Sequence, residues 1–162
     1  FRVMKKDSVC LKINRGEILN ELTRRTSYTA LSVNSVEIGA EALSDRIVLS
    51  CDEYEWCNDK FKAIFYKLRD TLLPFASVDS AKFADFDDTY ICFKINVAEG
   101  LYSSIKHHIN EVIINYILCE WYFERLQSKC EYVQLQYENN LSLLRMMLNR
   151  SLGVVRRPTT YL

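Results

Sequence analysis

The fold depends on residues 101–153, which read LYSSIKHHINEVIINYILCEWYFERLQSKCEYVQLQYENNLSLLRMMLNRSLG. Apolar side chains recur here at alternating steps of three and four residues, the spacing that places them along one face of an α-helix. The first series contains Ile105, Ile109, Val112, Tyr116, Cys119, Phe123 and Leu126, and the second contains Cys130, Val133, Tyr137, Leu141, Leu144 and Leu148. Because residues 127–129 (Gln-Ser-Lys) interrupt the pattern, we predict two long helices folded back on each other as a helical hairpin.

The last residues differ in character from the hairpin. Gly153 suits the left-handed conformation that ends many helices, and Pro158 follows it. We therefore predict an extended C-terminal arm over residues 154–162, after a single domain over residues 1–153. Free chain ends often fray, but an extended arm can also add a strand to a neighbouring subunit or fill its groove, and both interpretations remain open.

Two short strands are predicted upstream of the hairpin. Residues 9–13 alternate between apolar and other side chains, and residues 89–97 show the same period of two more clearly. We expect the two strands to pair, because an isolated strand would leave its backbone groups without partners. Residues 47–49 are the candidate for a third strand.

Helix signals account for much of the remaining chain. Asn14 and Glu17 form a capping box for a helix over residues 15–25, which the hydroxyl-rich residues 26–29 are expected to end. Beyond them we predict a loop with one helical turn at residues 37–43.

A second capping box, Ser50 with Glu53, precedes a long helix over residues 52–72 that Pro74 must end. The acidic residues 75–88 are predicted as a solvated loop. The expected fold class is therefore mainly α with a small β element (α+β), a helical bundle built on the C-terminal hairpin.

Composition is that of a single globular domain. The chain has 162 residues, of which 49% are hydrophobic and 26% charged, with only 4 Gly and 2 Pro. No apolar run approaches the roughly 18 residues of a membrane span, and residues 1–6 lack the apolar core of a secretory signal. We expect neither a membrane partner nor export.

The charges balance over the chain, with 21 Lys and Arg against 21 Asp and Glu. Tight non-specific binding to nucleic acid needs an excess of positive charge, so the balance predicts no strong grip on DNA. Arg145, Arg150, Arg156 and Arg157 nevertheless lie in a stretch without acids. They could contact phosphate or an acidic partner, or they could simply complement the dipole at a helix C-terminus.

No residue set indicates a metal, a cofactor or a catalytic centre. The cysteines are Cys10, Cys51, Cys57, Cys92, Cys119 and Cys130. Because no pair of them has C-x-x-C spacing and most lie in apolar patterns, we predict mainly buried, reduced thiols. His107 and His108 are adjacent and cannot both face one ion from a helix. Four glycines cannot supply a phosphate-binding loop, and no nucleophile elbow is present. We therefore expect a protein that is not an enzyme.

Three consecutive aromatic residues, Trp121, Tyr122 and Phe123, spread over most of a helix circumference. A single partner helix cannot cover all three. Either this helix is the central helix of the domain, covered by its neighbours, or part of the aromatic surface is a subunit interface, where such residues are enriched.

Four sequence features occur together in one order: EILNELTRRTSYT at residues 17–29, DRI at 45–47, a strand, and a helical hairpin with EWY at 120–122 that finishes in RRP at 156–158. In these features the chain resembles a family of small proteins encoded among the virion assembly genes of tailed phages and prophages of Bacteroidales. The layout is similar to head-tail connector (adaptor or neck) proteins of tailed phages. The likeness covers most of the chain and is weakest over residues 30–44.

The resemblance implies a structural virion protein that forms a homo-oligomeric ring at the portal, neck or tail. Its partners would be copies of itself and portal or tail proteins, with DNA as transient cargo of the channel. Its location would be the virion, and the host cytoplasm during assembly. The residues expected at subunit contacts are Trp121, Tyr122, Arg156, Arg157, Pro158 and Tyr161. The alternative is a monomeric phage regulatory module that binds a host or phage protein through an apolar helix face.

Overall fold

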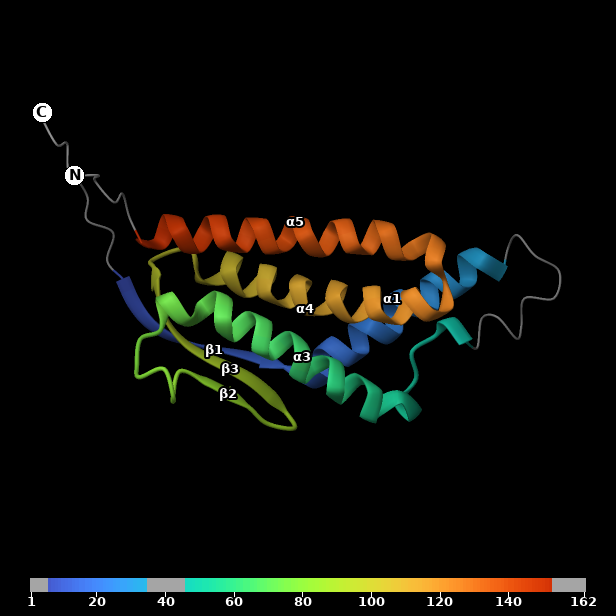
Figure 1. Cartoon of the computed structure of the whole chain (residues 1–162), viewed down its shortest axis with the longest axis horizontal. Coiled ribbons are helices and arrows are strands. Elements are labelled where there is room, and N and C mark those ends of the chain that lie inside the picture. The colour runs from blue at the N-terminus through green and yellow to red at the C-terminus, as the bar shows by residue number, and fades with distance from the viewer. Residues whose placement is uncertain (1–5, 35–45, 153–162) are drawn as a thin grey trace, which may run out of the picture.

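The computed structural model describes residues 6–34 and 46–152 (Figure 1). Its main elements are β1 (Lys6–Asn14), α1 (Arg15–Asn34), α3 (Tyr54–Leu72), β2 (Ala84–Phe86), β3 (Tyr90–Ala98), α4 (Tyr102–Arg125) and α5 (Gln127–Leu152). Long helices therefore dominate, and a small antiparallel sheet accompanies them. The predicted fold class, mainly α with a small β element, is confirmed.

The sheet has the strand order β1-β3-β2, so β3 lies in the middle. β1 and β3 pair antiparallel as predicted, with Leu11 opposite Phe93 and Ile13 opposite Ile91. These four side chains are buried, whereas Lys12 between them on β1 is exposed, so one face of the sheet packs on the helices. The third strand is β2, which lies inside the segment that we predicted to be a loop.

The segment around Ile47 and Leu49 is not a strand, which corrects the sequence prediction. Both side chains are buried, but side chains rather than a neighbouring strand satisfy the backbone. Trp121 Nε1 donates a hydrogen bond to the Ile47 carbonyl oxygen at 2.6 Å, and the Leu49 amide donates to Thr26 Oγ1 at 3.0 Å. Thr23 Oγ1 donates in turn to the Leu49 carbonyl oxygen. This segment is thus tied to α1 and α4.

The helix α1 continues to Asn34, although we predicted that residues 26–29 would end it. Their hydroxyls donate to backbone carbonyls of the preceding turn instead of competing with the helix. Thr26 Oγ1 donates to the Leu22 oxygen at 2.8 Å, and Ser27 Oγ donates to the Thr23 oxygen at 2.7 Å. The predicted turn at residues 37–43 lies outside the described residues.

The two predicted capping boxes have different outcomes. At α1 the Glu17 amide donates to Asn14 Oδ1 at 3.2 Å, as predicted. At the second site Ser50 makes no side-chain capping bond, and a 3-10 turn, Cys51–Glu53, leads into α3. The helix α3 ends at Leu72, as the following proline requires.

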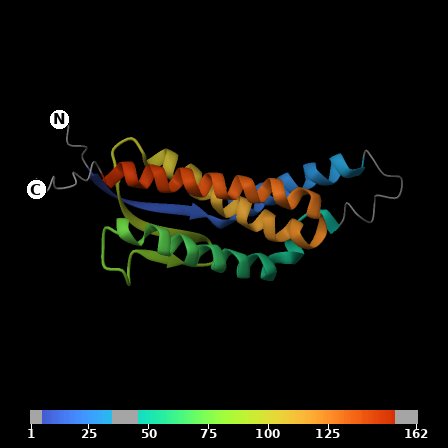
Figure 2. The same cartoon turned by 45° about the horizontal axis from the view of Figure 1, so that its top comes forward.

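The predicted helical hairpin is present, and α4 and α5 lie side by side along most of the molecule (Figures 1 and 2). Only Leu126, at φ −150° and ψ 74°, separates them, so residues 127–129 begin α5 rather than forming the break. Phe123 is 68% exposed, although we placed it on the buried stripe.

α4 is the central helix, with contacts to α1, α3, α5 and β1. Gly100, with φ +87°, supplies the left-handed turn that leads from β3 into it. The buried residues of α4 are Ile105, Ile109, Val112, Ile113, Ile114, Asn115, Ile117, Leu118, Trp121 and Tyr122. At 100° per residue they occupy the whole circumference of the helix.

Arg15, at the start of α1, is a buried cation that the sequence did not reveal. Its guanidinium carbon lies 4.8 Å from the ring centre of Phe61 and 4.7 Å from that of Phe86. Its terminal nitrogens donate to the Asp87 carbonyl oxygen at 2.6 Å and to Asn58 Oδ1 at 2.7 Å. Arg15 therefore joins α1 to α3 and to the end of β2.

The buried Thr26 hydroxyl provides a test of how the segment after α1 is held. Thr26→Val keeps the side-chain shape but leaves the buried Leu49 amide without its acceptor. We expect the free energy of unfolding to fall by about 1–3 kcal/mol, measured by urea denaturation. Thr71→Val, which removes a similar hydroxyl-to-carbonyl bond from an exposed position of α3, should cost less. Equal losses in the two variants would contradict the anchoring role.

Candidate functional site

An exposed apolar stripe runs along the outward side of α5. Tyr132, Leu135, Leu143 and Met146 are 64%, 54%, 40% and 40% exposed. With Asn139 at their centre, they follow one another at steps of three and four residues and share one side of the helix. We call these five residues the outer stripe.

The opposite side of α5 faces the protein. Its buried residues include Cys130, Val133, Leu144 and Leu148, which pack towards α4 and the rest of the core. α5 therefore has two apolar sides, and among residues 6–34 and 46–152 only one of them is covered. Monomeric proteins scatter single exposed apolar residues over the surface, whereas an aligned series along one helix is typical of a contact surface.

The sequence prediction missed the outer stripe because the inner series explained α5 completely as one half of a hairpin. The missed signal was a second apolar series with the same helical spacing, displaced to the other side of the helix. Finding it would have required following both sides of α5 separately.

The structure places the predicted contact residues Trp121 and Tyr122 inside the chain. They are only 1% and 2% exposed. Tyr122 donates its hydroxyl hydrogen to Thr29 Oγ1 at 2.9 Å, and the Arg125 guanidinium carbon lies 3.4 Å from the Trp121 ring centre. In this conformation neither ring offers area to a second subunit. The neighbouring Phe123 does.

The other predicted contact residues, Arg156, Arg157, Pro158 and Tyr161, lie outside the described residues, as does the arm over 154–162. Among the described residues the predicted contact set is represented only by Trp121 and Tyr122, which are neighbours in the sequence.

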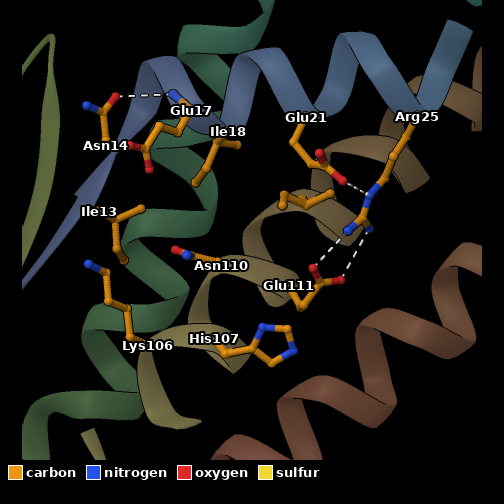
Figure 3. Close-up of a pocket in the computed structure, with 11 residues that line it drawn as sticks. Ile13, Asn14, Glu17, Ile18, Glu21, Arg25, Lys106, His107, Asn110 and Glu111 are labelled. Carbon is orange, nitrogen blue, oxygen red and sulfur yellow. Dashed lines mark hydrogen bonds and ion pairs between the residues drawn. The ribbon is translucent and has the colours of Figure 1, made fainter. Parts of the chain in front are cut away.

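A polar pocket of about 200 Å³ lies between α1 and α4 (Figure 3). Arg25 lines this pocket and forms ion pairs with the carboxylates of Glu21 and Glu111. Arg25 Nε lies 2.8 Å from a Glu21 oxygen, and its Nη2 lies 2.8 Å from a Glu111 oxygen. Lys106, His107 and Asn110 line the opposite side.

This arrangement clamps α1 onto α4. Because Arg25 already has two acidic partners, a ligand anion would have to displace one of them. Within residues 6–34 and 46–152, no three His, Cys, Asp or Glu side chains are grouped as metal ligands. None of the helices in these ranges is both long and apolar enough to cross a bilayer.

The Glu21 carboxylate carries the clearest electrostatic perturbation in the pocket. Hydrogen bonds from Arg24 and then Arg25 lower its pKa from 4.5 to about 2, against the opposing effect of burial. The charged form is therefore favoured in the folded chain.

The six cysteines are free thiols, but their burial is only partly as predicted. Cys57 and Cys130 are buried, whereas Cys10 and Cys51 are exposed. Cys119 and Cys130 meet across the hairpin with their sulfur atoms 3.5 Å apart. Burial, followed by the contact with Cys130, raises the pKa of Cys119 to about 12, so its thiol stays protonated at neutral pH.

The lowered pKa of Glu21 predicts a pH dependence of stability. A carboxyl whose pKa falls on folding stabilises the fold above its unfolded value of 4.5, and this contribution is lost as the pH falls toward 2. Wild type should therefore be more stable than Glu21→Gln at pH 7, by a modest amount because the carboxylate is partly solvated. The difference should vanish near pH 2 in urea titrations. Glu99→Gln, at an exposed turn, is the control, and a gap that persists at pH 2 would contradict the assignment.

Comparison with known proteins does not identify a relative of the chain. The chain matches no protein-family model, no curated protein and no solved structure.

Proposed function

We propose that the protein is a structural component of a tailed-phage virion that forms a homo-oligomeric ring at the neck or tail and catalyses no reaction. The observation that supports this most directly is the outer stripe, an aligned apolar surface on the outermost helix. Such a surface favours a protein that works by contact with other protein surfaces.

The size of the stripe favours assembly of many copies. Fully burying a Leu or Met side chain stabilises by about 1.5–3 kcal/mol. Since the four apolar side chains are already about half covered, burying the remainder would contribute on the order of 3–6 kcal/mol per copy. Association alone costs on the order of 4–15 kcal/mol. One such contact is therefore weak, and a closed ring, in which every subunit has two neighbours, is a favourable way to use weak contacts.

The layout of the chain agrees with this proposal. A helical domain with a small sheet is followed by the predicted arm, residues 154–162, which would be long enough to reach a neighbour in an extended form. The zero net charge suits a ring that lets DNA pass without binding it strongly. The partners in the proposal are portal or tail proteins, the location is the virion, and the host cytoplasm is the place of assembly.

A second candidate is a monomeric phage module that docks on a host or phage protein. Its support is a set of exposed apolar side chains near the ends of α1 and α4. Phe123, Tyr28 and Leu31 are 68%, 62% and 65% exposed, and the hydrogen bond between Tyr122 and Thr29 joins the two helix ends. The two candidates differ in what the purified chain does alone, because only the first requires self-association.

The mass of the full chain in solution tests the proposal. Native mass spectrometry and electron micrographs should show closed rings of many copies. The double substitution Leu135→Glu with Leu143→Glu should shift the protein to smaller species, since two charges would be buried at each contact. Tyr66→Glu, at a 57% exposed apolar position of α3, is the matched control and should leave the mass unchanged. A wild-type chain that stays monomeric at all concentrations would reject the proposal in favour of the docking module.

A further inference from the structure

Two cysteines meet across the helical hairpin. The Cys119 sulfur on α4 lies 3.5 Å from the Cys130 sulfur on α5, and the Cys130 thiol also donates a hydrogen bond to the Cys119 carbonyl oxygen at 3.6 Å. Cys130 is buried, whereas Cys119 is partly exposed. The pair therefore has one member at the surface and one inside the protein.

We infer that Cys119 and Cys130 form an oxidation site, at which an intramolecular disulfide joins α4 to α5. An S–S bond is about 2.05 Å long, so the two sulfurs need to approach by about 1.5 Å. Packed helices have axes roughly 8–10 Å apart and carry their Cα atoms about 2.3 Å from the axis. Facing residues therefore lie within the roughly 7 Å between Cα atoms that a disulfide can span. Closing the bond requires side-chain rotation rather than a rearrangement of the helices.

The oxidant is a small disulfide, which reacts by thiol–disulfide exchange. The Cys119 thiol loses its proton, and its sulfur attacks one sulfur of the small disulfide. That S–S bond breaks, which leaves a mixed disulfide on Cys119 and releases one small thiolate. The Cys130 sulfur, after losing its proton, then attacks the Cys119 sulfur and releases the second small thiolate. The two cysteines thus lose two electrons and two protons, and the small disulfide gains both as it becomes two thiols.

The environment of Cys119 makes this reaction slow. Burial, followed by the contact with Cys130, raises the pKa of Cys119 to about 12. Exchange requires the thiolate, which is scarce at neutral pH for such a group. We therefore expect oxidation on the order of hours rather than seconds, so the site responds to a lasting change of surroundings.

A second thiol contact in the chain is less suited to oxidation. Cys92 and Cys10 contact each other through their thiols on the sheet. In the register of β1 and β3, Cys10 lies opposite Lys94 and Cys92 lies opposite Lys12, so the two cysteines are diagonal neighbours. Diagonal neighbours have Cα atoms roughly 7–8 Å apart, at or beyond the limit for a disulfide. The geometry therefore favours the pair in the hairpin.

The bond would close a loop over residues 119–130, which contains Leu126, the residue between the two helices. Closing a loop of this size restricts the unfolded chain and raises the ratio of folded to unfolded molecules by about 100-fold. Because α4 is the central helix and α5 the outer layer, the bond would fix the outer helix on the core.

The oxidation site does not depend on the proposed function. A virion component would assemble in a reducing host cytoplasm and leave for an oxidising medium, which is a change that closes such bonds. The bond itself is measured on the purified chain whether or not that chain forms rings. Failure of the bond would therefore leave the ring proposal intact, and failure of the ring would leave the bond intact.

Peptide mapping after oxidation tests the site in the folded full chain. In a background with the exposed Cys10 and Cys51 changed to Ser, the protein is incubated with hydroxyethyl disulfide, blocked with iodoacetamide and digested with trypsin. Trypsin cuts after Arg125 and Lys129, between the two cysteines of the site. Peptides 107–125 and 130–145 should therefore stay joined without reductant and separate when reductant is added.

Two controls show that the folded chain is what reacts. Cys130→Ser should stop at the mixed disulfide on Cys119, because the second sulfur is missing. Cys57 is only 1% exposed and should stay unmodified while the chain is folded. Peptides that are not joined, or joining that is no faster than modification of Cys57, would overturn the inference.

Thermal unfolding gives a second readout of the same bond. The oxidised protein should melt about 5–10 °C above the reduced protein. Cys119→Ser, treated in the same way, should show no such shift. Joined peptides without a rise in the melting temperature would show that the bond does not stabilise the hairpin, and would overturn its role in fixing α5.

Discussion

The burial of α4 around its whole circumference is the constraint on which the rest of the structure depends. A helix that is apolar on all sides must be covered on all sides, and α1, α3, α5 and β1 each cover part of it. This leaves α5 as an outer layer with one side on the core and one side on the surface (Figures 1 and 2). The outer stripe is an apolar surface that the described part of the chain leaves exposed.

Contacts between distant parts of the sequence hold this arrangement. The Trp121 indole reaches back to the Ile47 backbone, Thr26 receives the Leu49 amide, and Arg25 meets Glu111 on α4. The buried Arg15 does the same at the other end of α1, between two aromatic rings. Because these groups are buried or partly buried, losing one partner leaves the other unsatisfied, which costs more than the bond itself contributes. We expect α5 to be presented on a rigid support.

The local patterns of the sequence predicted the local elements. The spacing of apolar residues predicted α3, α4 and α5, and the alternation in residues 9–13 and 89–97 predicted β1 and β3. The failures arose where distant side chains decide the outcome. The segment at Ile47 and Leu49 has the composition of a strand, but its hydrogen-bond partners are side chains of α1 and α4. The hydroxyls after Arg25 extend α1 because they bond within the helix.

The candidate site was harder to predict than the fold. Periodicity shows that a side of a helix is apolar, but it does not show whether the same chain covers that side. Trp121 therefore looked suitable for an interface and is buried, while Leu135 and Leu143 looked unremarkable and are exposed. Only the packing of α5 against α4 distinguishes its two apolar sides.

The central claim is that the outer stripe contacts a second copy of the chain, and nuclear magnetic resonance can observe such a contact directly. In an isotope-filtered NOESY experiment on a mixture of labelled and unlabelled chains, only contacts between molecules give cross-peaks. Within one α5 the side chains of Leu135 and Leu143 are about 12 Å apart along the helix, too far for such a signal. Self-association through the outer stripe predicts a cross-peak from the methyl groups of Leu135 or Leu143 to the second molecule. Its absence from a sample whose mass shows self-association would contradict the account.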